Sequence, residues 1–384
     1  MGAKAKNGLL FILFAALFLP LLQSEFPFIK SAPLNGEFTA APDTSFTLKT
    51  WFDESYWYKK NLHINDSMGF RPDFIRLNNQ LDYSLFKKIH SEWRLMGENS
   101  CIFQDVYIYS YLGRDYDGYA YIYEKVRKLK AVQDTLAKLG KSLIFVQAPC
   151  KAFYYPEYFP QRYKDTVKCI SNYEAYARLA DSFAVNQIDF NAWFRGMKTN
   201  SKELLYPKQG FHWSTYGSLL AGDSLIRYME RQRHIHMIHP YWNEIEHTTI
   251  PRFKDNDIAK SMNLLFPPTT ETFSYPVLQY TADATATKPK IIYVGDSFLF
   301  QWLDEWLIQN TSSHWQIWYY NQSVVDKDHA RDERFMPSMP SNFDRQKEID
   351  SADCIVIMFT SRNMTKMGQN FVETVYDHYF PAKK

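Results

Sequence analysis

A serine in the setting of a nucleophile, Ser297, lies in the sequence Gly-Asp-Ser-Phe at positions 295–298. The apolar run KIIYV precedes it and the helical pattern LFQWLDEWL follows, so a tight turn between a strand and a helix is predicted here. Such a turn exposes the hydroxyl and the serine's own backbone N–H to one incoming carbonyl. A helix-capping serine is the alternative. We favour the nucleophile, which requires a general base elsewhere in the chain.

The candidate base is His212, within YPKQGFHWSTYG at positions 206–217. It directly precedes a predicted helix that Ser214 can cap, which places the imidazole on a loop that enters a helix. A structural histidine packed between aromatic rings is the other reading. Asp326 and His329 form a competing Asp-x-x-His pair, although their dense charge run is more typical of a solvated loop.

Other residues have possible roles in binding. Asn321, after the apolar run WQIWYY, is a candidate oxyanion donor, with a turn-forming asparagine as the alternative. Trp213 and Tyr216 could stack on a sugar acceptor, or simply pack. Arg71 and Lys151 stand among aromatic residues and could bind an anionic glycan, although structural ion pairs are favoured.

The elements that must position these residues alternate from the middle of the chain onward. Strands are predicted at 142–147, 185–190, 290–294, 315–320 and 353–359. Helices are predicted at 119–139, 172–183, 214–231, 299–309 and 368–378. Short apolar strands separated by amphipathic helices predict a three-layer α/β/α sandwich with a parallel sheet, which carries its chemistry at the carboxyl ends of the strands.

Two regions lie outside this alternation. Residues 31–115 are rich in aromatics and turns, and are predicted to form a leading segment packed on the core. Residues 235–285 are rich in His, Pro and Thr, and are predicted to be an insertion or long loop that crosses near the site, or else a surface excursion. The α/β domain is therefore predicted to span 116–384.

The N-terminal residues indicate export. Lys4 and Lys6 precede an apolar run at 9–22, and no small-x-small cleavage site follows it directly. We therefore expect residues 1–30 to be an uncleaved membrane anchor, with a cleaved signal peptide as the alternative. The rest of the chain would then be water-soluble and extracytoplasmic.

Composition excludes several classes of protein. The 384 residues are 46% hydrophobic and 22% charged, unlike a disordered chain, and a net charge of +2 argues against a nucleic-acid partner. Aromatic residues reach 17%, which fits a ring-rich core and also sugar-stacking surfaces. Four cysteines without Cys-x-x-Cys spacing predict neither a zinc site nor a redox pair. Cys150 and Cys169 could form a disulfide, or the thiols could be free.

The order of several motifs resembles the alginate O-acetyltransferase family, a branch of the SGNH-hydrolase-like superfamily. The His-Trp pair and the later Gly-x-Ser are joined by loosely matching segments. These lie at 51–52, 65–72, 81–86, 148–151 and 155–160. The resemblance covers nearly the whole chain after the apolar run.

The resemblance implies a periplasmic protein that transfers acetyl groups to an extracellular polysaccharide. It implies that Ser297 is the nucleophile and His212 the base, with no metal or organic cofactor. The acetyl groups would come from a multi-pass membrane acyltransferase partner, near which an N-terminal anchor would hold the domain.

One position departs from the family pattern. The family has an aspartate two residues before the histidine, where this chain has Gly210. A carboxylate at that place fixes the tautomer of the imidazole, so its loss has to be compensated. A backbone carbonyl or Asp189, at the end of the 185–190 strand, could orient His212, or the protein could be inactive.

Three functions remain open from the sequence. The favoured one is a serine-dependent polysaccharide O-acetyltransferase. A carbohydrate esterase would use the same serine and histidine with water as the acceptor, and a non-catalytic glycan-binding subunit would use neither.

Overall fold

The chain forms two compact units in the computed structural model, Met1–Ser91 with Ala259–Pro267, and Glu92–Ile258 with Pro268–Lys384. The structure describes residues 3–36, 41–52, 55–90, 93–268, 271–327, 339 and 343–381. The sequence-based boundary after residue 115 therefore falls within the second unit.

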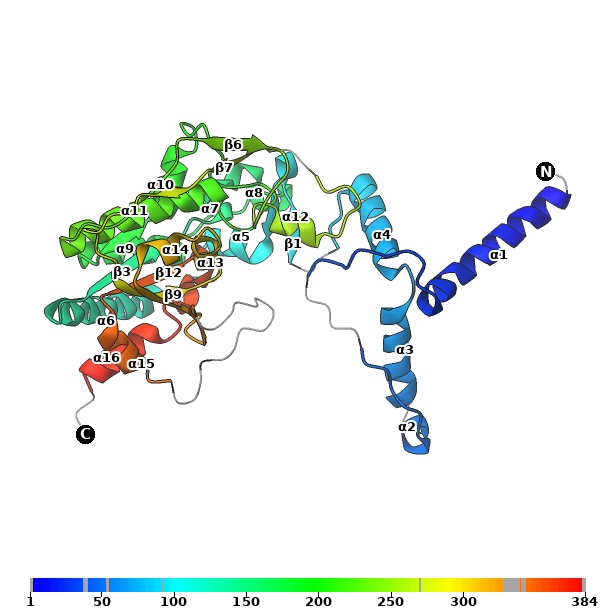
Figure 1. The fold of residues 1–384 in the computed structure, drawn as a ribbon, viewed down its shortest axis with the longest axis horizontal. Coiled ribbons are helices and arrows are strands. Elements are labelled where there is room, and N and C mark those ends of the chain that lie inside the picture. Colours follow the sequence, from blue (N-terminus) through cyan, green and yellow to red (C-terminus); the bar gives the residue numbers. More distant parts are fainter. Residues whose placement is uncertain are drawn as a thin grey trace. The chain divides into compact units, whose positions relative to one another are not determined.

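The first unit is helical. Its helices are α1 (Ala3–Glu25), α2 (Leu48–Phe52), α3 (Ser55–Ser67) and α4 (Arg71–Phe86) (Figure 1). α2 and α3 bury no residue among those described, and α4 buries only Asn79. The buried apolar residues of this unit lie in its second segment, at Ala259, Met262 and Leu264.

The second unit is built on a six-stranded sheet. Its strands, in spatial order, are β11 (Ser323–Val325), β10 (His314–Tyr319), β9 (Lys290–Gly295), β12 (Cys354–Phe359), β3 (Ser142–Gln147) and β4 (Gln187–Asp189). All neighbours pair in parallel except β11, which is antiparallel to β10. All six residues of β12 are buried, as expected for a parallel strand covered on both faces.

Helices form the layers on either side of this sheet. α6 (Tyr119–Lys138) packs on β3 and against α9 (Asn172–Ser182) and α16 (Phe371–Tyr379). On the opposite side, α11 (Thr215–Arg233) packs against α13 (Leu299–Asp304) and α14 (Leu307–Thr311). Figure 1 shows α11 above the strands and α6 with α16 below them. The predicted three-layer α/β fold is confirmed.

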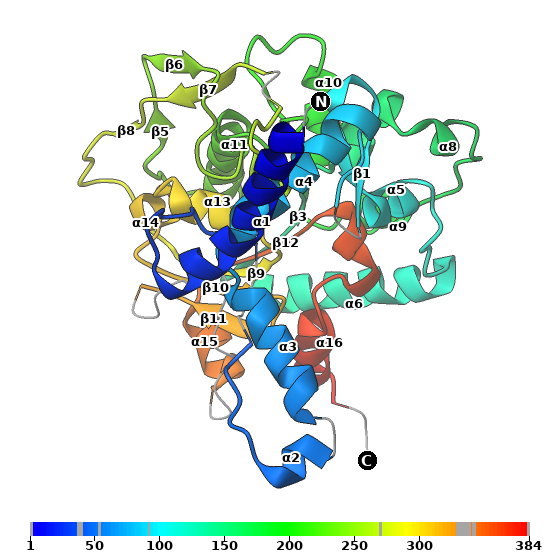
Figure 2. The ribbon, with the colours of Figure 1, turned by 90° about the vertical axis from the view of Figure 1, so that its right-hand side faces the viewer.

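Shorter elements complete the second unit, and Figure 2 shows several of them around the sheet. They are β1 (Arg94–Met96), β2 (Ile102–Gln104), α5 (Asp105–Tyr111), α7 (Lys151–Tyr154), α8 (Gln161–Lys164), α10 (Phe190–Met197) and α15 (Arg345–Ser351). Three 3-10 helices are at Glu98–Ser100, Pro156–Tyr158 and Ser361–Lys366.

The predicted elements correspond closely to the observed ones, with one instructive exception. The helix predicted at 299–309 is divided, because Trp306 adopts a left-handed backbone with φ of 59° between α13 and α14. Just before the break, the buried carboxylate of Glu305 accepts hydrogen bonds from Ser218 Oγ at 2.6 and 2.7 Å. This buried contact is a tertiary one, which helical periodicity does not record.

The region predicted as an insertion at 235–285 has structure of its own. Within it, β5 (Pro240–Tyr241) pairs with β8 (Gln279–Tyr280), and β6 (Ile245–Thr248) pairs with β7 (Phe273–Pro276). The short helix α12 (Asp257–Ser261) lies between these strands in sequence.

The cysteines are free thiols, the alternative to the disulfide considered from the sequence. Cys101, Cys150 and Cys354 are buried free thiols, and Cys169 is exposed and free. The disulfide considered between Cys150 and Cys169 is absent from the described residues.

Candidate active site

Ser297 lies in the turn between β9 and α13, at the carboxyl edge of the sheet. The turn is held by Asp296, whose buried carboxylate accepts hydrogen bonds from Thr360 N at 2.8 Å and Asn363 Nδ2 at 2.8 Å. Both donors follow β12, the strand beside β9. The turn is therefore fixed to the neighbouring strand, and Ser297 remains partly exposed between two buried residues, Asp296 and Phe298.

His212 enters the same place from the loop before α11. Its ring packs on Phe298, with ring centroids 4.7 Å apart, and against the edge of Phe211 at 5.0 Å. Phe211 in turn contacts Tyr107 on α5 at 4.9 Å. Ser214 caps α11 by accepting a hydrogen bond from Gly217 N at 2.9 Å, as the sequence predicts. The imidazole is 6% exposed and is held in one orientation by these rings.

The two side chains meet although they are 85 positions apart. His212 Nε2 lies 2.9 Å from Ser297 Oγ, within hydrogen-bonding distance. The other ring nitrogen, Nδ1, lies 2.7 Å from Asp257 Oδ2. The three residues form a continuous carboxylate–imidazole–hydroxyl relay, the arrangement that activates a serine for attack.

The carboxylate comes from the segment predicted to cross near the site. Asp257 is the first residue of α12, and its Oδ1 also accepts a hydrogen bond from Phe211 N at 2.6 Å. It therefore binds both the ring of His212 and the backbone next to it. No spacing in the sequence connects Asp257 with His212, which lies 45 residues earlier. The one available signal was an acidic pair, Asp255 and Asp257, in a segment without periodicity.

Gly210 leaves the space that this segment occupies. A Cβ atom at Gly210 would lie 2.6 Å from the carbonyl oxygen of Asp255 and 2.7 Å from Cγ of Pro207. Both distances are shorter than atoms in contact tolerate. The backbone at Asp255 can therefore approach the loop closely only because position 210 is glycine, and this approach brings Asp257 to His212.

The surroundings set the protonation states of the relay. Burial lowers the pKa of His212 below its ordinary value of 6.5, and the bond and charge of Asp257 only partly oppose this. Burial alone would raise the pKa of Asp257, but the bond and charge of His212, the bond from Phe211 N and the charge of Lys254 together outweigh it, and the pKa is lowered. At neutral pH the relay thus contains a neutral imidazole and an ionised carboxylate. The tautomer that fits donates from Nδ1 to Asp257 and accepts at Nε2 from Ser297.

Asp255 binds the far side of the same loop. It is fully buried, and its Oδ1 accepts a hydrogen bond from Thr215 N at 3.0 Å, at the first residue of α11. Burial raises its pKa to about 7, against the bonds from Tyr275 and Thr215. Asp255 and Asp257 therefore hold the loop on both sides of His212.

Two sequence-based assignments for the site are corrected. The amide of Asn321 donates to the carbonyl of Gln369 at 3.0 Å, and the residue turns the chain with φ of 53°. Asp189 caps α10 by accepting from Ala192 N at 2.8 Å, and also accepts from the Tyr173 hydroxyl at 2.8 Å. Neither residue has a hydrogen bond to Ser297 or His212 among the described residues, because the Asn321 amide N–H donates to the Gln369 carbonyl and the Asp189 carboxylate caps α10.

The proposed sugar-stacking residues have different positions. Trp213 is fully buried between Phe298, at 5.7 Å, and Trp302, at 5.3 Å, so it cannot stack on a ligand. Tyr216 is partly exposed on the first turn of α11 and packs edge-on against Trp242.

The two basic candidates have structural partners. The ammonium group of Lys151 is buried and donates to the carbonyl of Lys208 at 2.8 Å and to that of Ile102 at 3.1 Å. It therefore supports the loop that leads to His212 and is not accessible to a glycan. Arg71, in the first unit, pairs with Asp66 at 3.4 Å.

The competing histidine is not placed. His329 lies outside the described residues, whereas Asp326 lies just after β11. Within the part of the chain that is described, no group of three or more His, Cys, Asp or Glu residues is arranged to hold a metal ion.

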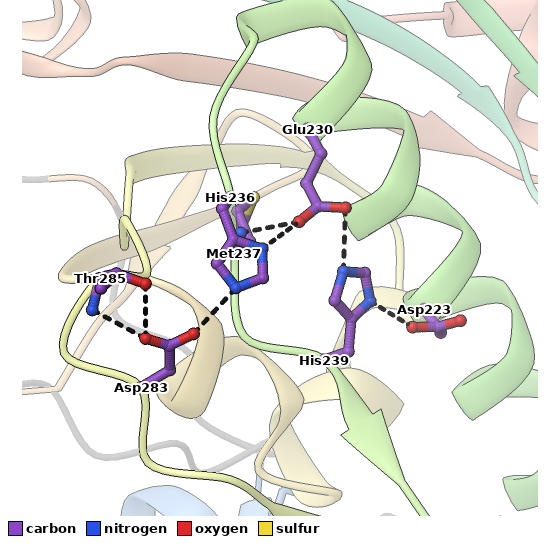
Figure 3. A network of polar contacts seen from close by, with 7 residues as sticks. All are labelled: Asp223, Glu230, His236, Met237, His239, Asp283 and Thr285. Atoms are coloured by element: carbon purple, nitrogen blue, oxygen red, sulfur yellow. Dashed lines mark hydrogen bonds and ion pairs between the residues drawn. The ribbon is translucent and has the colours of Figure 1, made fainter.

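A network of charged side chains fastens the segment that carries Asp257 (Figure 3). Glu230 on α11 lies 2.9 Å from His239 Nε2 and 3.4 Å from His236 Nδ1, in the loop between α11 and β5. His236 Nε2 lies 2.9 Å from Asp283, in the loop between β8 and β9, and His239 Nδ1 lies 2.6 Å from Asp223 on α11. Both ends of the segment are thus joined to the helix that begins beside His212.

Comparison with known protein families gives one decisive match. The family described as SGNH hydrolase-like domain, acetyltransferase AlgX, matches residues 107–301, about half of the chain. The chain belongs to this family. The matched region includes both His212 and Ser297, and the family assignment agrees with the resemblance seen in the motifs.

Solved structures with a related arrangement are distant in sequence. The O-acetyltransferase domain of Pseudomonas putida AlgJ is 13% identical, with a TM-score of 0.45 over 74% of this chain and 99% of that one. Pseudomonas aeruginosa AlgX is 11% identical, with a TM-score of 0.44 over 76% and 71%. Bacillus cereus PatB1 is 11% identical, with a TM-score of 0.39 over 64% and 91%. No curated protein matches this AlgX-family chain.

The N-terminal helix has the dimensions of a membrane span. Among the described residues, Lys6–Glu25 of α1 is the one stretch long and apolar enough to cross a bilayer, and a signal sequence has the same character.

Proposed function

We propose that this AlgX-family protein is an extracytoplasmic O-acetyltransferase that moves an acetyl group through Ser297 to a hydroxyl of a polysaccharide. The observation that supports it best is the relay from Asp257 through His212 to Ser297, with distances of 2.7 and 2.9 Å. Belonging to a family of acetyltransferases supports the class of reaction.

In the first half-reaction, Ser297 Oγ attacks the carbonyl carbon of an acetyl donor. His212 Nε2 takes the hydroxyl proton, while Asp257 stabilises the imidazolium and keeps the ring in position. The backbone N–H of Ser297 donates no hydrogen bond within the described residues, so it is available to the oxyanion. The intermediate collapses, His212 protonates the leaving group, and an acetyl ester forms on Ser297.

In the second half-reaction, a sugar hydroxyl attacks the acetyl-serine. His212 removes the proton of this hydroxyl and then returns a proton to Ser297 Oγ as the ester bond breaks. Water in place of the sugar would make the protein an esterase. The choice between the two depends on how well the acceptor excludes water from the site.

The donor and the location belong to the same proposal. An exported domain does not meet cytosolic acetyl-coenzyme A, so a multi-pass membrane acyltransferase is the expected source of acetyl groups. The apolar helix α1 would keep the domain close to this partner and raise the effective concentration of each for the other.

The test uses the purified protein with p-nitrophenyl acetate, with and without acceptor oligosaccharides. We expect a burst of p-nitrophenol and one added acetyl group on the peptide that contains Ser297. Ser297→Ala and His212→Ala should each reduce turnover by about 10⁶-fold, since residues of such a relay act as a unit. Ser313→Ala, an exposed serine elsewhere in the second unit, is the matched control.

The products separate the three functions. Acetylated oligosaccharide supports the transferase, and free acetate alone, at a rate that acceptors do not change, indicates an esterase. Sugar binding without any acetyl-enzyme would identify a non-catalytic subunit and overturn the proposal.

A further inference from the structure

The C-terminal end of α1 packs against the rest of the first unit and forms hydrogen bonds with it. Ser24 Oγ accepts a hydrogen bond from Gly69 N at 2.7 Å, and its hydroxyl proton is shared between the carbonyls of Pro20 at 2.9 Å and Ser67 at 3.2 Å. A Cβ atom at Gly69 would lie 2.3 Å from the carbonyl oxygen of Pro20 and 2.6 Å from Cβ of Gln23. The turn between α3 and α4 is therefore shaped to fit the last turns of α1.

The chain that leaves α1 is fastened to α4 as well. Phe28 packs edge-on against Phe70, with ring centroids 5.8 Å apart. The guanidinium of Arg76 donates to the carbonyls of Ala32 at 2.9 Å and Pro33 at 2.6 Å. Cleavage of a signal peptide at the end of the apolar run would remove one side of this packing. The structure of the first unit is thus built around a retained α1.

Phe46, Trp51, Tyr56 and Trp57, in and next to α2 and α3, form an aromatic cluster in which the rings pack on one another and none is fully buried. Trp51 lies 5.4 Å from Phe46, 6.4 Å from Tyr56 and 4.8 Å from Trp57, measured between ring centroids. Phe52 beside them is 81% exposed. Soluble surfaces rarely keep so many rings together in water, whereas Trp and Tyr concentrate where a membrane meets water.

We propose that α1 is retained as a membrane anchor and that this aromatic cluster lies in the headgroup region of the bilayer beside it. A span of 20 residues is about 30 Å long, so the end of α1 at Ser24 reaches the membrane surface. Because Ser24 is bonded to the turn at Gly69, that turn is held at the same level, and α3 begins about 20 Å from it. In this proposed arrangement α3 lies along the membrane surface, so the rings at its start reach the headgroups, where their apolar faces leave water.

The proposal rests on the membrane attachment in the proposed function, but not on acetyl transfer. Its test measures no activity, so the failure of one does not decide the other.

The lipid contact is tested with the full chain in phosphatidylcholine vesicles whose acyl chains carry bromine close to the headgroups. Bromine quenches tryptophan fluorescence at contact, and Trp51 and Trp57 are two of the ten tryptophans. We expect quenching that is lost in the Trp51→Tyr, Trp57→Tyr double variant and kept in Trp306→Tyr, which removes an exposed indole of the second unit. Equal quenching in the double variant and the parent chain would overturn the lipid contact. No quenching of the parent chain, although it is inserted in the vesicles, would also overturn it and would indicate that a membrane protein covers the aromatic cluster.

The retention of α1 is tested on protein isolated from membranes of the producing cell. We expect its mass to include the whole apolar run, and Gly69→Val to make residues 25–35 more sensitive to protease while the chain stays in the membrane fraction. A mature chain that begins after Glu25 would overturn the proposal.

Discussion

At the scale of single residues, the proposed chemistry uses a carboxylate that reaches His212 from a distant part of the chain. Asp257 makes the same contact that an aspartate two residues before the histidine would make, but it is delivered by α12. Gly210 permits this delivery by leaving room for the backbone at Asp255. Gly210 is therefore explained by the delivery of the carboxylate from position 257, and it is not by itself a sign of an inactive protein.

Asp257→Asn should lower kcat by about 10³- to 10⁴-fold with little change in KM, because the amide supports the wrong tautomer of His212. Adding Gly210→Asp to this variant should not restore activity, since the new Cβ would meet the carbonyl of Asp255. Steady-state kinetics on an acetyl ester measure both effects. Recovery of the parent rate in the double variant would contradict the role of Gly210.

The pH dependence of kcat/KM should follow the ionisation of His212. Only the neutral ring can accept the proton of Ser297, and burial holds the pKa of this ring below 6.5. We expect the rate to rise with pH, and the midpoint of this rise to lie below pH 6.5. Since Asp257 opposes the effect of burial, Asp257→Asn should move the acid limb of its residual activity to lower pH.

At the scale of elements, the loop before α11 is held between two aspartates of one segment. Asp257 binds the loop at Phe211, and Asp255 binds it at Thr215. The charge network around Glu230 holds the ends of the same segment on α11 (Figure 3). α11, which follows His212, and the segment that supplies Asp257 are therefore held together by hydrogen bonds and ion pairs at several points.

Asp255→Asn should change how stability depends on pH. In the folded chain the pKa of this carboxyl is raised from 3.8 to about 7, so the folded chain retains a proton that the unfolded chain has released. The contribution of Asp255 to the free energy of unfolding therefore falls as pH rises across this interval. Urea denaturation at several pH values should show a shallower fall in the variant. An identical slope in both proteins would contradict the buried, protonated state.

Glu230→Gln should loosen the segment that carries Asp257, because it removes the negative charge between His236 and His239. Hydrogen exchange in residues 236–287 should become faster while the central strands keep their protection. Asp134→Asn, which removes an exposed pair with Lys130 on α6, is the matched control and should have no such effect.

At the scale of the whole molecule, the five parallel strands of the sheet fix the edge at which the site is assembled. β12 lies between β9 and β3, and its carboxyl end supplies Thr360 and Asn363 to the turn that holds Ser297. The sheet therefore supports both the stability of the second unit and the position of the nucleophile.

Ile357→Ala in β12 should destabilise the second unit by about 2–5 kcal/mol, because it leaves a cavity in a fully buried central strand. Denaturant unfolding measures the loss, and Leu139→Ala, at an exposed position after α6, is the control. A change below about 1 kcal/mol would indicate that the sheet repacks around the smaller side chain.

The sequence by itself determined the main strands and helices of the α/β layers, and it marked two of the three relay residues as candidates. Short apolar runs such as 142–147 are typical of buried strands, and Ser297 and His212 stand at element boundaries that local patterns mark. Only the tertiary structure decided the carboxylate and excluded Trp213, Asn321 and Asp189 from the site. Which side chains face one another across 45 residues depends on packing between segments, and hydrophobic periodicity contains no information about it.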